Sequence, residues 1–76
     1  MRTIWSGCFT PATLQLTGKV PADYTVVQDG TDKAPGRIGS GFGGEVLVCL
    51  LDGDDGQWFR DLCAAKDPEW DVTYRA

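Results

Sequence analysis

Apolar positions along the chain form short runs with a strand-like pattern. Residues 13–17 (TLQLT) alternate apolar and polar side chains, which indicates a half-buried strand, and Thr10-Pro11-Ala12 before them has hairpin length. Residues 45–51 (EVLVCLL) are almost continuously apolar, which is typical of a central strand. We predict five strands in all, at residues 2–9, 13–17, 24–28, 45–51 and 70–75.

Residues 55–66 carry the one helical pattern. The apolar side chains recur on one face of a helix, at Trp58, Phe59, Leu62 and Cys63. Asp54 is expected to cap the amino-terminal amides, with Gln57 three positions later completing a pattern like a capping box. Asp67-Pro68 is expected to end the helix.

The remaining long segment, residues 31–44, contains five glycines and Pro35, and we expect it to be a mobile loop. The sequence therefore predicts one small α+β domain over residues 1–76, with elements in the order β-β-β-β-α-β. Its sheet would have four to five strands, mostly antiparallel, with one helix packed on a face.

Charge is distributed unevenly along the chain, whose formal net charge is −4. Residues 1–44 hold four basic and three acidic residues, whereas residues 45–76 hold three basic and eight acidic ones. No two of the seven basic residues are adjacent, so the chain lacks the basic cluster that neutralises phosphates. Neither nucleic acid nor an anionic membrane is expected as a direct partner.

The chain has three cysteines, Cys8, Cys49 and Cys63, and no histidine. The odd count and wide spacing predict neither a disulfide framework nor a structural zinc site, and a reducing cytosol fits best. Because no histidine can activate a nucleophile, no enzyme is predicted, and no cofactor is expected. The longest apolar run, Val46 to Leu51, is too short to span a membrane.

A glycine motif provides one candidate ligand site. Gly39, Gly41 and Gly44 match the pattern G-x-G-x-x-G, which lets backbone amides approach phosphate oxygens. A dinucleotide site requires a helix after this motif, but residues 45–51 read as a strand. With Val46 the run resembles the glycine-rich loop of protein kinases, which also need a lysine on the strand, and residues 45–51 have none.

The acidic turn Asp52-Gly53-Asp54-Asp55-Gly56 looks like the start of a calcium-binding loop. Counted from Asp52, the fifth position is Gly56, the sixth is Gln57 and the twelfth is Cys63, and each of these departs from the EF-hand pattern. A helix-capping turn explains all five residues, so no metal site is predicted.

The leading hypothesis is a protein-binding module that inhibits a larger, basic partner. Its size and charge are similar to those of anti-CRISPR and anti-restriction proteins of phages, which would make the partner a nucleic-acid-handling complex. Carboxylates would pair with arginine and lysine, and two aromatic side chains would anchor the interface. The candidate contact residues are Asp52, Asp54, Asp55, Asp61, Asp67, Glu69, Trp70, Asp71 and Phe42. The alternatives are a phosphate or nucleotide ligand at the glycine motif, or a homo-oligomeric structural subunit.

Overall fold

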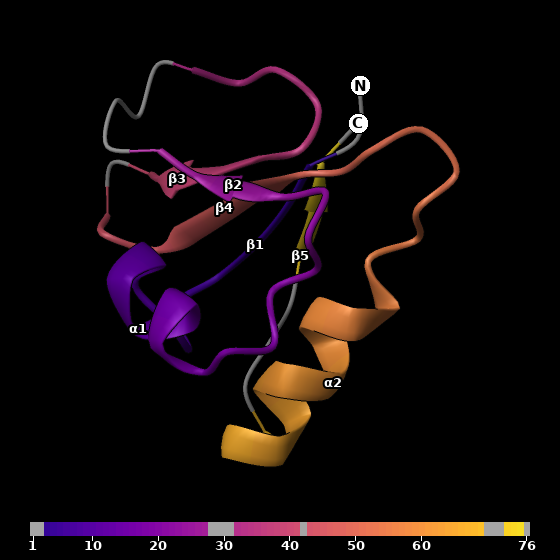
Figure 1. Ribbon diagram of the computed structural model, residues 1–76. Coiled ribbons are helices and arrows are strands. Elements are labelled where there is room, and N and C mark those ends of the chain that lie inside the picture. Colours follow the sequence, from indigo (N-terminus) through magenta and orange to yellow (C-terminus); the bar gives the residue numbers. More distant parts are fainter. Residues whose placement is uncertain (1–2, 28–31, 42, 70–72, 76) are drawn as a thin grey trace.

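The chain forms a five-stranded sheet with two helices. The structure is a computed structural model, and it describes residues 3–27, 32–41, 43–69 and 73–75. The elements in chain order are β1 (Thr3–Ser6), α1 (Pro11–Leu16), β2 (Thr25–Val26), β3 (Arg37–Ser40), β4 (Val46–Cys49), α2 (Gln57–Lys66) and β5 (Thr73–Arg75) (Figure 1). The predicted α+β class is confirmed, with two helices in place of one.

The strands do not lie in the order in which they occur in the chain. The spatial order is β2-β3-β4-β1-β5, so that the first strand lies between the fourth and the fifth. β1 pairs antiparallel with β4 and with β5, β3 pairs antiparallel with β4, and β2 pairs parallel with β3. The sheet is therefore mostly antiparallel, as predicted, and β4 is its central strand.

The core lies on one face of the sheet. In the register, Val48 lies opposite both Ile4 and Ile38, and all three side chains have no exposed surface. Leu14 of α1 and Phe59 of α2 belong to the same buried cluster, so both helices cover this face. Neither helix in the described part of the chain is long and apolar enough to cross a membrane.

The predicted strand at residues 13–17 is wrong, because α1 occupies Pro11–Leu16. Thr10 is the N-cap, and Pro11 begins the helix at a position where its missing N–H is not needed. The Thr10 and Thr13 hydroxyls each accept a hydrogen bond from the other residue's backbone N–H, at 3.3 and 2.8 Å. This reciprocal cap lets Leu14 enter the core while Leu16 remains 85% exposed.

The predicted loop at residues 31–44 is interrupted by strand β3, which the sequence did not indicate. Ile38 is the only large apolar residue of this strand, so the apolar pattern is weak. The glycines after the strand close a hairpin to β4: the Gly41 N–H donates to the Glu45 carbonyl at 2.8 Å, and the Gly44 N–H donates to the Gly41 carbonyl at 3.1 Å. Gly44 has a φ of 84°, which favours glycine.

Helix α2 agrees with the predicted helix, except for its cap. The N-cap residue is Gly56, with a φ of 76° and no capping side chain, so the capping role predicted for Asp54 and Gln57 is wrong. A Cβ atom at Gly56 would lie 2.6 Å from Cδ1 of Ile4. Glycine is therefore needed here both for the backbone conformation and for the close approach of α2 to the sheet.

Candidate binding surface around helix α2

Asp54 is the centre of a hydrogen-bond network between the residue before β2, the turn before α2, and α2 itself. Its Oδ2 accepts hydrogen bonds from the Tyr24 hydroxyl and, at 3.0 Å, from Nε1 of Trp58. Its Oδ1 accepts one from the Gly56 N–H at 2.8 Å. The Tyr24 oxygen in turn accepts from the Leu51 N–H at 3.0 Å, and the Tyr24 and Trp58 ring centroids are 5.1 Å apart.

These contacts shift the acidities of both partners. Burial and the hydrogen bond to Asp54 raise the pKa of Tyr24 to about 12. Burial alone would raise the pKa of Asp54, but the donors Tyr24, Gly56 and Trp58 outweigh it and lower that pKa. Asp54 is therefore an ionised, internally bonded carboxylate that holds the turn, and its oxygens are already engaged within the fold.

Four other predicted contact residues are exposed: Asp61 lies on α2, Asp52 and Asp55 precede the helix, and Glu69 follows it. We call these four the acidic surface: Asp52, Asp55, Asp61 and Glu69. Oδ1 of Asp55 accepts a hydrogen bond from the Gln57 N–H at 3.0 Å, and Oδ1 of Asp61 accepts one from the Gln57 side-chain amide at 2.9 Å. Both carboxylates are thus positioned by Gln57 and remain open to solvent.

Asp67, another predicted contact residue, lies at the carboxyl end of α2 and is half-buried. Its backbone N–H donates to the Cys63 carbonyl at 2.8 Å, which caps the helix. Its Oδ1 accepts a hydrogen bond from the Glu69 N–H at 3.0 Å. Asp67 therefore orders the backbone that carries Glu69. The remaining candidates, Trp70, Asp71 and Phe42, lie outside the described residues.

Lys66, the last residue of α2, is exposed, but its ammonium group contacts the body of the protein. Nζ of Lys66 donates to the Cys8 carbonyl at 2.7 Å and lies 4.5 Å from the centroid of the Phe9 ring. Arg60 is half-buried. The segment therefore presents carboxylates to solvent, while the Lys66 ammonium is held against the end of β1.

The glycine motif does not have the geometry of a phosphate loop. Gly39 is a buried residue of β3, opposite Leu47 in the ladder, and the amides of Gly41 and Gly44 are used in the hairpin turn. A Cβ atom at Gly41 would lie 2.0 Å from Oε1 of Glu45, and one at Gly43 would lie 2.7 Å from Oε2. A carboxylate therefore lies over these glycines, and its charge would repel a phosphate.

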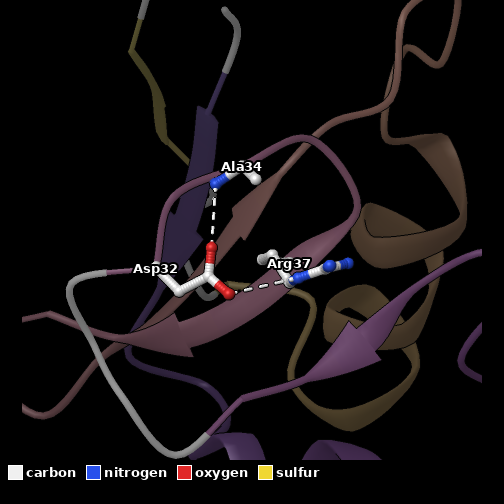
Figure 2. A network of polar contacts seen from close by, with 3 residues as sticks. All are labelled: Asp32, Ala34 and Arg37. Atoms are coloured by element: carbon white, nitrogen blue, oxygen red, sulfur yellow. Dashed lines mark hydrogen bonds and ion pairs between the residues drawn. The ribbon is translucent and has the colours of Figure 1, made fainter.

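Outside α2, the basic side chain of Arg37 forms an ion pair with Asp32. Figure 2 shows Asp32 between Ala34 and Arg37: Oδ2 lies 3.2 Å from Nε of Arg37, and Oδ1 accepts a hydrogen bond from the Ala34 N–H at 3.3 Å. Both charged side chains are about two-fifths exposed, at 38% and 41%. Such an ion pair contributes about 0–1 kcal/mol and holds the backbone that leads into β3.

Comparison with protein-family models, with curated proteins and with solved structures finds no match to this chain. Within the described part of the chain, no group of three or more acidic or cysteine side chains is arranged to hold a metal ion.

Sequence reasoning missed one contact, between Cys8 and Cys63. Cys8 lies in the turn after β1, Cys63 lies on α2, and both belong to the core cluster. Sγ of Cys8 lies 3.9 Å from the backbone carbonyl oxygen of Cys63, and burial together with the neighbouring Cys8 thiol raises the pKa of Cys63 to about 11. Only the helical face that places Cys63 beside Phe59 could have suggested that this thiol points toward the sheet.

Proposed function

We propose that this protein binds a basic surface of a larger protein through the acidic surface along α2. The observation that supports the proposal is the group of four exposed carboxylates on and beside this helix. Asp52, Asp55, Asp61 and Glu69 are exposed, whereas the Lys66 ammonium is bound to the Cys8 carbonyl. Carboxylates held in this way can accept paired hydrogen bonds from arginine and attract lysine on a partner.

The partner class that fits best is a protein that handles nucleic acid. Such proteins carry arginine and lysine arranged to neutralise phosphates, and a row of carboxylates presents the same negative charge to them. A domain of 76 residues with net charge −4 would act by occupying that basic surface and excluding the nucleic acid. The proposed function is therefore inhibition by occupancy.

Two variants of equal charge test the proposal. Asp52→Lys with Asp61→Lys changes the net charge from −4 to 0 on the acidic surface. Asp32→Lys with Glu45→Lys, which we call the hairpin variant, makes the same change outside the acidic surface: Asp32 lies before β3, and Glu45 lies in the hairpin between β3 and β4. Each tagged protein is used as bait in a bacterial lysate, and the captured proteins are identified by mass spectrometry.

We expect the wild type and the hairpin variant to capture the same basic protein, and the α2 variant to lose it. Equal capture by the α2 variant, or capture of acidic partners only, would contradict the proposal. Circular dichroism of all three proteins establishes that each is folded before the comparison is made. If nothing is captured, self-association measured by solution mass becomes the better hypothesis.

A further inference from the structure

Two cysteines that are 55 positions apart meet between β1 and α2. Sγ of Cys8 donates to the Cys63 carbonyl at 3.9 Å, and both residues belong to the same buried cluster. Their residues are 3% and 1% exposed. Cys49 is also buried, but it lies outside this core cluster, where it pairs with Thr3 across the β1–β4 ladder.

We propose that Cys8 and Cys63 form an intramolecular disulfide that joins the end of β1 to helix α2. In the folded chain Sγ of Cys8 lies 3.9 Å from the carbonyl oxygen of Cys63, so the two residues are already side by side, as a disulfide requires. Cys49 is not placed to compete, because its thiol lies apart from this cluster. The proposal thus names one pairing out of the three that three cysteines allow.

The chemistry is exchange with a small-molecule disulfide such as glutathione disulfide. One cysteine thiolate attacks this disulfide, forms a mixed disulfide and releases one glutathione thiol. The second cysteine thiolate then attacks the mixed disulfide and releases the second glutathione thiol. Overall the two cysteines lose two protons and two electrons, and glutathione disulfide is reduced to two thiols.

The surroundings predict a slow reaction in the folded protein. Burial and the neighbouring Cys8 thiol raise the pKa of Cys63 to about 11, so that little of the reactive thiolate exists at neutral pH. Because both thiols are buried, the attack needs local opening of the contact between α2 and the end of β1. Equilibrium is therefore best reached by refolding in the redox buffer.

The pairing is read out by peptide mapping. Reduced wild-type protein is refolded from urea into glutathione buffers of graded ratio, remaining thiols are blocked with N-ethylmaleimide, and the protein is digested with trypsin. Cleavage after lysine and arginine places the three cysteines in separate peptides, residues 3–19, 38–60 and 61–66. We expect peptides 3–19 and 61–66 to be joined and Cys49 to carry the maleimide.

The matched variants are Cys49→Ser, which should retain the cross-link, and Cys8→Ser, which should lose it. In wild type we expect the equilibrium constant for the 8–63 pair to be at least about a hundredfold higher in native buffer than in 8 M urea, because the fold holds the thiols together. A cross-link that involves Cys49, no cross-link in native buffer, or equal constants in the two conditions would each overturn the proposal.

Discussion

At the scale of single residues, Asp54 is a predicted contact residue whose carboxylate instead forms hydrogen bonds within the fold. The sequence predicts Asp52, Asp54 and Asp55 alike as contact residues, but Asp54 accepts three hydrogen bonds from groups within the fold. One donor, Tyr24, is 30 positions away in the chain. The sequence around Asp54 predicts that it lies in a turn, but it does not predict the hydrogen bond from the distant Tyr24 hydroxyl.

We expect Tyr24→Phe to lower the free energy of unfolding at pH 7 by about 1–3 kcal/mol, because it leaves the Leu51 N–H and one Asp54 lone pair without a protein partner. The folded pKa of Tyr24, about 12, lies above its ordinary value of about 10. Its contribution is thus complete below about pH 10 and is lost as pH rises through 12. Urea unfolding of wild type and variant between pH 7 and 11 measures the difference, which should shrink above pH 10. A difference that is absent at pH 7 would contradict this role.

At the scale of elements, helix α1 and strand β3 are the two that sequence patterns misjudged. The alternation of Leu14 and Leu16 is compatible with a strand that buries both, but α1 buries only Leu14. Strand β3 has little pattern of its own and exists because β2 and β4 pair with it on either side. For β3 non-local pairing overrode a weak local pattern, whereas for α1 the local cap of Thr10, Pro11 and Thr13 outweighed the alternation of the leucines.

The two leucines of α1 give a paired measurement. Leu14→Ala should lower the free energy of unfolding by about 2–5 kcal/mol, because it empties a fully buried site. Leu16→Ala should change it by no more than about 0.5 kcal/mol, because that side chain is 85% exposed. Chemical denaturation of both variants distinguishes the helix from the strand, for which the two losses would be similar.

At the scale of the whole molecule, the fold is a sheet with both helices on one face, and the tightest approach between these layers is at Gly56. The N-cap of α2 lies against Ile4 of β1 with no space for a side chain. At the same place the Gly56 N–H donates to Oδ1 of Asp54, which holds the turn before α2. The proposed binding surface therefore depends on how α2 is fixed to the sheet.

Two glycines on the same turn test this close approach. Gly53 and Gly56 have φ angles of 87° and 76°, so alanine at either position costs about 1–2 kcal/mol in backbone strain. Only at Gly56 would the new methyl group also meet the Ile4 side chain, 2.6 Å away, while nothing lies within 4 Å at Gly53. Gly56→Ala should therefore destabilise by about 1–3 kcal/mol more than Gly53→Ala in thermal or urea unfolding. Equal losses would mean that α2 can move away from the sheet.

The sequence by itself determined the α+β class, strands β1 and β4, helix α2 and the acidity of the region around that helix. These features depend on the periodicity of apolar side chains or on a count of charges, both of which are local properties. Only the tertiary structure decided that Leu16 stays in water, that the glycine motif closes a hairpin under Glu45, and that Cys8 meets Cys63. Each of these depends on a contact between residues that folding brings together. Such a contact produces no periodic pattern of apolar and polar residues in the sequence.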